Sequence, residues 1–385
     1  MPGKWQTSVN TDGGTFSAAT SSVTVDLSKA NFLGEVRLRM TWLNGSTTNL
    51  STRIEDDVDL IQILANGGAV KFFNGVTCRK MAHYSRGIRP TTDYNELAAT
   101  DQIADFPLLF TRFPGDEVCV LPAKVFRTLQ LKVNISMTLS DTTAYEATFA
   151  AANADYYVHE VEYISADDPT SKKILKETDV DSYTTVASGD VDRPTGGLPL
   201  GNIIRKILIY CREDGCEDGT DITHLRLGVN NFSEIPYHMR WIDRQDQESE
   251  WYRSREEQSE FLMISNTDTR NLDIGRITSI NLTAPGTSTT TNPRIVNHTS
   301  LATGNVLTVA LSDDAGTAVT ADSQISMLVK GMAFSAWTNM IDLDPAGDLS
   351  GGIDTSNVND VKVKVTNGGA GGTVYVTVQE VVSLV

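Results

Sequence analysis

The stretch GGLPLGNIIRKILIYCREDGCEDGTDITHLRLGVNNFSEIPYHMRW (Gly196–Trp241) decides the predicted fold. It contains an apolar segment over Ile203–Tyr210, a turn rich in acidic residues and glycine, and a second apolar segment over Ile222–Val229. Short apolar runs bounded by turn residues are typical of β-strands. A polar break and a proline follow. The stretch therefore predicts two strands joined by a turn, followed by a helix.

A second version of this unit occurs in the N-terminal part of the chain. There, NFLGEVRLRMTWL (Asn31–Leu43) is followed by DLIQILANGGAVKFF (Asp59–Phe73). The copies are 167 residues apart at their Leu-Gly pairs (Gly34 and Gly201) and 164 residues apart at the Asn turn that follows. Repeats of about 20–50 residues indicate solenoids, whereas this spacing is the size of a whole domain. We therefore expect two similarly built domains in tandem.

Composition and charge narrow the class of protein. The chain has 385 residues, of which 40% are hydrophobic, so two cores can be buried. Apolar runs are too short for a membrane span, and residues 1–10 do not resemble a signal peptide, so we expect a chain made and folded in a cytoplasm. The net charge of −17 disfavours direct binding to nucleic acid, because phosphate binding needs a basic surface.

The four cysteines do not form a metal-binding pattern. Cys78, Cys119, Cys211 and Cys216 contain no CxxC pair, which disfavours zinc. Cys211 and Cys216 flank a turn and could face each other across a hairpin. Reduced thiols are the expectation for a cytoplasmic product.

The first domain is expected to contain only strands. Residues 1–21 are rich in Gly, Ser and Thr, and we expect them to form a flexible arm. Residues 91–105 should form an exposed polar loop. The predicted strands of the first domain (22–155) are Ser22–Leu27, Val36–Thr41, Asp59–Leu64, Ala69–Phe73, Phe106–Phe113, Val118–Leu121 and Leu129–Leu139. Many short strands separated by turns predict a β-sandwich or a barrel.

The second domain (156–385) is expected to be larger because of an insertion. Pro236–Arg255 is the one convincing helix, and we expect it to lie on the surface of the sandwich with one side held. Short strands are predicted at Ile277–Leu282, Val306–Leu311 and Ile325–Val329, with an exposed loop or tower around 283–325. Near the end, alternating valines on both sides of the turn Asn367–Gly372 predict a hairpin with the valines facing inward.

Few residues have the pattern of a catalytic or metal site. Nucleotide-binding loops, zinc-protease motifs and nucleophile elbows are missing from the sequence. Two acidic segments resemble calcium loops, with oxygen ligands at alternating positions, but neither has the spacing to a closing Glu that an EF-hand needs. Turn geometry alone explains Asp-Gly in a hairpin turn, and we expect calcium at neither place. The two segments are the turn with Glu213, Asp214, Glu217, Asp218 and Asp221, and the segment with Asp342, Asp344 and Asp348. We expect no catalytic residue, no cofactor and no enzymatic activity.

The duplicated unit resembles the repeated unit of double jelly-roll major capsid proteins of icosahedral, tailless double-stranded DNA viruses of the PRD1–adenovirus lineage. The similar features are the strand that begins with Leu-Gly, the strand that ends in Asn-Gly-Gly or Val-Asn-Asn, and the charged helix that follows. LPAKVF (Leu121–Phe126) is similar to the closing part of a first jelly roll, and MIDLDPAGDLSGGIDTSNVNDVKVKV (Met340–Val365) to that of a second. The chain departs from the family pattern at 91–105 and 283–325.

The resemblance implies an all-β chain with two tandem eight-stranded jelly-roll sandwiches, a short surface helix and inserted loops. It implies a coat subunit whose homotrimers form pseudo-hexagonal capsomers that tile a virion shell assembled in the host cytoplasm. The implied partners are other copies of the chain, penton and minor capsid proteins and, in some members, an internal membrane. Sequence-specific binding to nucleic acid is not implied.

Two other classes of protein stay open. A carbohydrate-binding adhesin or receptor-binding protein would need an exposed aromatic platform, and aromatic residues make up only 7% of the chain. A glycoside hydrolase would need a pair of carboxylates whose separation only a three-dimensional structure can give.

Overall fold

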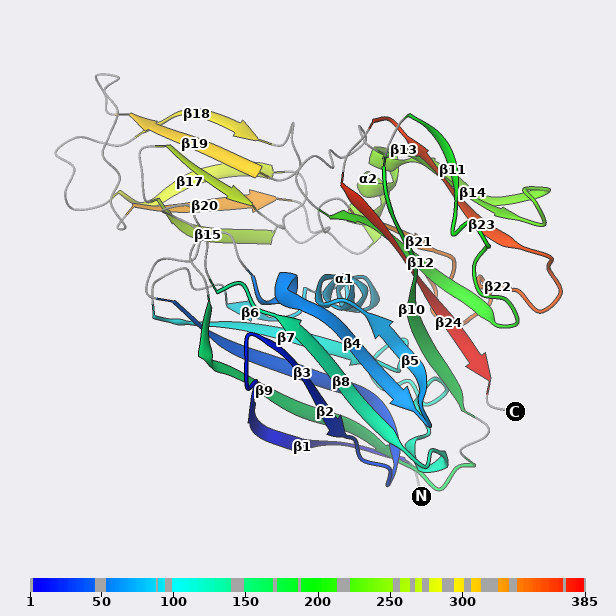
Figure 1. Cartoon of the computed structure of the whole chain (residues 1–385). Coiled ribbons are helices and arrows are strands. Elements are labelled where there is room, and N and C mark those ends of the chain that lie inside the picture. The colour runs from blue at the N-terminus through cyan, green and yellow to red at the C-terminus, as the bar shows by residue number, and fades with distance from the viewer. Residues whose placement is uncertain are drawn as a thin grey trace.

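A computed structural model of the chain describes residues 3–45, 53–87, 89–93, 99–139, 149–168, 172–185, 188–212, 222–251, 257–263, 267–271, 277–285, 294–300, 306–312, 325–331, 338–369 and 372–383. It consists mostly of β-strands, arranged as two jelly rolls and a separate inserted β-structure (Figure 1). Neither described helix has the length and hydrophobicity needed to cross a membrane.

The first jelly roll consists of two facing sheets. One sheet has the order β1-β9-β3-β7-β6, and the other contributes β2-β8-β4-β5. The bounds are β1 (Lys4–Thr15), β2 (Thr20–Asp26), β3 (Phe32–Asn44), β4 (Val58–Ala65), β5 (Gly68–Phe73), β6 (Thr92–Asp93), β7 (Asp101–Leu109), β8 (Leu129–Ser136) and β9 (Phe149–Ile164). Two 3-10 turns, Ile54–Asp57 and Ala123–Val125, lie in the connections.

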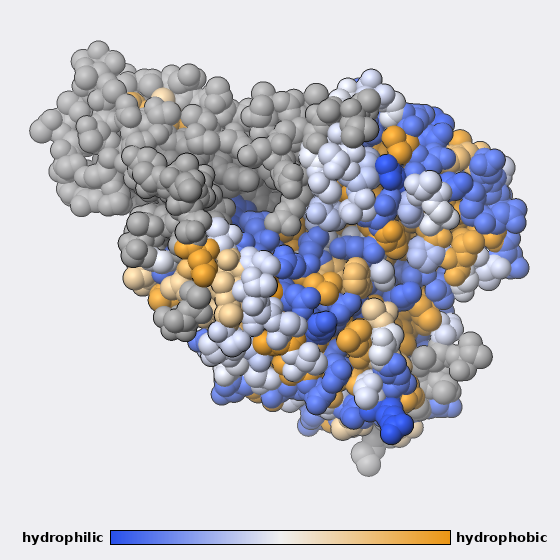
Figure 2. Space-filling view, in the orientation of Figure 1, coloured by the Kyte–Doolittle hydropathy of each residue, from blue (hydrophilic) through white to orange (hydrophobic). Residues whose placement is uncertain are grey.

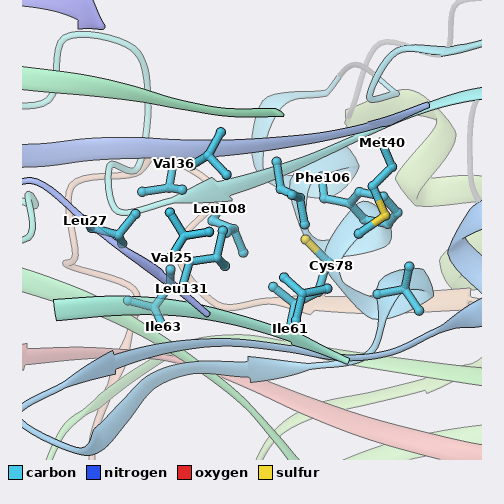
Figure 3. Packing of buried hydrophobic residues seen from close by; sticks show 14 of the residues in the cluster. Val25, Leu27, Val36, Met40, Ile61, Ile63, Cys78, Phe106, Leu108 and Leu131 are labelled. Carbon is cyan, nitrogen blue, oxygen red and sulfur yellow. The ribbon is translucent and has the colours of Figure 1, made fainter. Parts of the chain in front are cut away.

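Alternation along the strands places one side of each in the core. Val36, Leu38 and Met40 of β3 are fully buried. They belong to one core cluster with Ile61 and Leu131 of the opposite sheet, and Figure 3 shows Val36 and Met40 among these residues. Side chains of a strand point alternately to opposite faces, so this period-2 pattern fixes which face is buried.

The second jelly roll repeats this architecture. Its sheets contribute the orders β10-β24-β12-β21, with β22 beside β12, and β11-β23-β13-β14. The bounds are β10 (Lys173–Thr184), β11 (Gly189–Arg193), β12 (Ile203–Arg212), β13 (Ile222–Val229), β14 (Glu234–Arg240), β21 (Thr338–Asp342), β22 (Ile353–Asp354), β23 (Val361–Asn367) and β24 (Thr373–Ser383). With the eight principal strands of each roll numbered in chain order, both rolls pair them as 1-8-3-6 and 2-7-4-5.

This identical order supports the predicted duplication and extends it. β3, β4 and β5 correspond to β12, β13 and β14, and a helix follows in each roll. Helix α1 (Gly75–Arg86) and helix α2 (Trp241–Trp251) begin 166 residues apart. The helix is therefore part of both copies, although only the second was predicted.

Helix α1 was missed because charged and polar residues such as Arg79, Lys80 and His83 are among its buried residues, so its sequence does not look like that of a core helix. Its ends do carry local signals. The Asn74 side chain accepts a hydrogen bond from the Thr77 backbone N–H at 2.8 Å, and Gly87 ends the helix in a left-handed conformation at φ 66°. Asn at a helix start and Gly just past its end are favoured for these reasons.

Helix α2 is shorter than predicted. Pro236 does not start it, because residues 234–240 form strand β14 at the edge of a sheet, where a missing backbone N–H is tolerated. Trp241, Arg244 and Glu248 are buried while Ile242 is 40% exposed. One side of the helix thus packs against the second roll while the other side is exposed, as predicted.

The insertion between α2 and β21 forms two three-stranded sheets. They have the orders β15-β20-β17 and β16-β19-β18. The bounds are β15 (Glu257–Met263), β16 (Thr267–Asn271), β17 (Ile277–Pro285), β18 (Arg294–Ser300), β19 (Val306–Ser312) and β20 (Ile325–Gly331). The three strands predicted here are present, and the insertion is wider than 283–325. We call residues 257–331 the tower.

The predicted limits of the first domain are wrong at both ends. Residues 4–15 form strand β1, which pairs with β9 from Lys4 opposite Ile164 to Thr15 opposite Asp155, instead of a flexible arm. An edge strand exposes much of its surface, which explains its polar sequence. Residues 156–164 belong to β9 in the first roll, so the second roll begins after residue 164, not at 156.

Three local predictions also need correction. Residues 101–105, predicted as part of a polar loop, begin β7, and Gln102 and Asp105 are buried. Val118–Leu121 makes only isolated bridges. The C-terminal valines of β23 and β24 do face inward, but the two strands do not form a hairpin. They lie in opposite sheets and cover the same core from two sides.

Candidate assembly site

The two rolls are joined by direct strand pairing. β5 of the first roll runs parallel to β10 of the second, with Lys71 opposite Glu177 and Phe72 opposite Thr178. This pairing fuses one sheet from each roll into a nine-stranded sheet. We call the contact between β5 and β10 the roll–roll junction.

A buried polar chain crosses the junction. Lys71 Nζ donates hydrogen bonds to Glu177 Oε2 at 2.7 Å and to the backbone oxygen of Leu109 at 2.6 Å. Gln379 Nε2 donates to the other Glu177 oxygen at 2.6 Å and is itself linked to Arg205. Burial lowers the pKa of Lys71, and the Glu177 carboxylate opposes that shift. A buried charge needs such a partner and further hydrogen bonds to be tolerated.

Helix α1 lies between the rolls and contacts both (Figure 1). Met81 and Tyr84 of α1 pack against Leu208, Tyr210 and Met340 of the second roll. Asn74 Nδ2, at the helix start, donates to the Tyr210 hydroxyl at 2.8 Å. The junction therefore combines strand pairing, apolar packing and hydrogen bonds.

Two carboxyl groups near these contacts have raised pKa values. Burial raises the pKa of Asp179 in β10 to about 7, although Thr377 donates a hydrogen bond to it at 2.5 Å. Burial likewise raises the pKa of Glu248 in α2 to about 7, against the effect of Arg244 and the Met340 backbone N–H. Desolvation disfavours the charged form of a carboxyl group, which explains both directions.

Protein groups already bind the carboxylates of the second candidate calcium segment. Asp342 pairs with Lys206 at 2.9 Å, and Asp344 pairs with Arg205 at 2.8 Å. The Asp348 carboxylate accepts hydrogen bonds from the backbone N–H and hydroxyl of Ser350. Calcium needs several free oxygen ligands, so this arrangement favours a structural role for the three aspartates.

The other candidate metal residues lie outside the part of the chain that the structure describes. They belong to the acidic turn at 213–221. Within the described residues, no group of three or more His, Cys, Asp or Glu side chains is arranged to hold a metal ion.

The sequence favoured reduced thiols and left a bridge between Cys211 and Cys216 open. Cys78 and Cys119 are free and buried, whereas Cys211 is disulfide-bonded. Cys216, the remaining cysteine, lies outside the described residues.

Sequence reasoning also missed a cavity near the end of the first roll. It has a volume of about 240 Å³ and lies between the side chains of Trp5, Arg86 and Phe113. Phe113 is 49% exposed, and Arg86 forms an ion pair with Glu35 in the cavity wall. On the visible face of the described rolls, hydrophobic residues are scattered in small groups among hydrophilic ones (Figure 2).

Comparisons with known proteins agree with this architecture. No protein-family model and no curated protein sequence matches the chain. Solved structures do match it over nearly its whole length. The major capsid protein (MCP) of Sulfolobus Turreted Icosahedral Virus (STIV) superposes on this chain with a TM-score of 0.60 at 11% sequence identity, and the match covers 99% of this chain and 97% of that chain.

Two further structures have the same architecture. The major capsid protein P2 from bacteriophage PM2 has a TM-score of 0.52 at 9% identity, with coverage of 98% and 97%. A chain of the PBCV-1 virus capsid has a TM-score of 0.55 at 9% identity, with coverage of 98% and 93%. At such low identity these likenesses concern the fold. The chain has the double jelly-roll fold of the major capsid proteins of icosahedral viruses.

Proposed function

We propose that the chain is a major capsid protein, the structural coat subunit of an icosahedral virion. The observation that carries this proposal is the pair of jelly rolls with identical strand order, fused through one sheet, in a chain that solved capsid proteins match over 98% or more of its length. Two such rolls make one broad, rigid block. A block of this kind suits a tile in a shell.

In this proposal three copies form a pseudo-hexagonal capsomer. Six rolls of the same topology around one axis approximate six-fold symmetry, although only three chains are present. The tower and the chain ends lie at opposite ends of the molecule (Figure 1). The tower would point away from the particle and the ends of the chain toward its interior.

The partners follow from the same role. The chain would contact other copies of itself first, and penton and minor capsid proteins at specialised positions of the shell. Assembly would take place in the host cytoplasm. A chain with a net charge of −17 would enclose a genome without binding its phosphate groups. No enzymatic step is part of the proposal.

Light scattering of the purified chain tests this role. We expect a mass of three times 41.9 kDa at micromolar concentration. A chain that stays monomeric up to the concentrations at which coats assemble would contradict the proposal.

The cavity beside Trp5 and Phe113 is the observation that favours the alternative, a carbohydrate-binding protein. Aromatic walls with a neighbouring charged pair are found in many small-ligand sites. A glycan array with the purified chain separates the two classes. Strong binding that a Trp5→Ala variant loses, together with a monomeric mass, would favour the alternative.

A further inference from the structure

The duplicated topology leaves a pair of matching strand edges open, one at each end of the chain's pair of rolls. Among the described residues, β1 is the terminal strand of its sheet in the first roll, and β14 is the terminal strand of its sheet in the second. Their counterparts in the other roll are β10 and β5, the two strands that pair at the roll–roll junction. Within the chain, the fifth strand of the first roll (β5) pairs with the first strand of the second roll (β10). The fifth strand of the second roll (β14) and the first strand of the first roll (β1) are the matching strands that remain at sheet edges.

Residue equivalence on the β5 side follows from two independent landmarks. Lys71 and Tyr237 each lie four residues before the start of the helix that follows. Each is also opposite a buried residue of the preceding strand, Ile63 for Lys71 and Leu227 for Tyr237. Tyr237 therefore occupies in β14 the position that Lys71 has in β5.

A shared irregularity gives the equivalence on the β10 side. Both strands contain a register shift of their pairing, directly after Asp179 in β10 and directly after Val9 in β1, where it is the first of two. Glu177 and Thr7 each lie two residues before it. Bulges of this kind mark fixed positions in a fold, so Thr7 occupies in β1 the position that Glu177 has in β10.

We propose that β14 of one copy pairs in parallel with β1 of a second copy, with Tyr237 opposite Thr7 and His238 opposite Ser8. This contact would repeat between chains the junction that joins the rolls within a chain. It rests on the proposed coat function and names the surface through which the copies meet. A contact between two different patches runs head to tail and closes into a ring when the rotation allows. Three chains with three internal and three external junctions would then make a ring of six rolls.

Exposure at the two edges supports this partner. Val9 on β1 is 57% exposed and Ile235 on β14 is 47% exposed, and both are among the most exposed large apolar residues of the described chain. Open strand edges with apolar residues promote association, and stable proteins pair or protect them. Pairing with another copy would cover both edges at once.

Pro236 limits the extent of the proposed contact. It has no backbone N–H to donate, so pairing cannot run along the whole of β14. The junction within the chain needs only two residue pairs, Lys71 with Glu177 and Phe72 with Thr178. The equivalent positions, Tyr237 and His238, lie just after the proline, so a contact of the same length fits.

Disulfide trapping tests the contact in the full-length chain. Directly paired residues of neighbouring strands have Cα atoms about 5 Å apart, within the range that a disulfide spans. Ser8 and His238 both lie outside the two apolar cores, so Ser8→Cys and His238→Cys should leave the fold intact. With both substitutions in one chain, we expect oxidation to yield at least ten times more covalently linked chains than either single variant, with linked trimers as the largest product.

A matched control uses a different open edge of the first roll. Ser22 lies on β2, the terminal strand of the nine-stranded sheet. Ser22→Cys combined with His238→Cys should give no more linkage than the single variants. Light scattering of the same samples separates the two proposals. Trimers without linkage through Ser8 and His238 would overturn the proposed contact alone, whereas monomers would overturn the contact and the coat function together.

Discussion

Lys71 Nζ lies 2.7 Å from Glu177 Oε2, and the two residues belong to different jelly rolls. Both side chains are almost completely buried, with 0% and 4% of their surfaces exposed. The connection between the rolls therefore depends on a charged pair inside the protein as well as on apolar packing. Strand pairing, this charged pair and the packing of helix α1 together hold the two rolls in contact.

Lys71→Met should destabilise the chain strongly, because it leaves the Glu177 carboxylate buried without its cation. Removing one partner of a buried pair costs about 3–5 kcal/mol of unfolding free energy. Chemical denaturation measures this. The double variant Lys71→Met with Glu177→Gln should regain a large part of the loss, since Gln379 still has an oxygen to which it can donate. A loss below about 1 kcal/mol in the single variant would show that the pair is not buried as described.

Asp179 predicts a specific pH dependence. Its pKa in the folded chain, about 7, lies above the ordinary value of 3.8, so the folded state holds the proton more tightly than the unfolded state. The contribution of this group to stability is then full below about pH 4 and is lost as the pH rises toward 7. Asp179→Asn cannot ionise. The stability of this variant relative to the natural chain should therefore rise over that range.

Thermal or chemical unfolding of both chains at several pH values checks the difference. Other carboxylates titrate in both chains and cancel in the comparison. Glu248, whose pKa is raised in the same direction, remains in both. A difference that is flat between pH 4 and 7, or that falls, would contradict the assigned environment of Asp179.

Gly75 tests the close packing of helix α1. A Cβ atom at this position would lie 2.6 Å from the backbone oxygen of Glu55 and 2.8 Å from Val58 Cβ. Gly75→Ala should therefore cost about 1–3 kcal/mol, as overpacking does, although Ala favours helices more than Gly. Gly196→Ala is the matched control, since no atom lies within 4 Å of its added Cβ. It should change stability by less than about 0.5 kcal/mol.

The state of the cysteines predicts a simple count. A chain purified without reductant and then unfolded should show fewer than four reactive thiols, because Cys211 is disulfide-bonded while Cys78 and Cys119 are free. Addition of reductant before the assay should raise the count to four, the number of cysteines in the chain. Four thiols without reductant would restore the expectation of a fully reduced protein.

The duplication and the inward faces of the strands could be predicted because both are local patterns. The alternating valines of β23 and β24 showed which side chains are buried, and the hairpin of β4 and β5 followed from its Asn-Gly turn. Pairing between distant strands has no such local signal. The turn after Asn367 therefore looked like a hairpin although it connects opposite sheets.

The junction was not predicted because its residues carry no motif. Lys71 and Glu177 are 106 residues apart, and each is an ordinary charged residue within a strand. They come into contact only when the chain folds. Strand β1 was missed for a related reason, since an edge strand with one neighbour needs few apolar residues, and its sequence looks like a loop.

Electron microscopy of the purified, associated chain tests the coat function most directly. The account predicts particles with a pseudo-hexagonal outline built from six jelly rolls, with three towers on one face and the chain ends on the other. A monomer, or an assembly without three-fold symmetry, would contradict it.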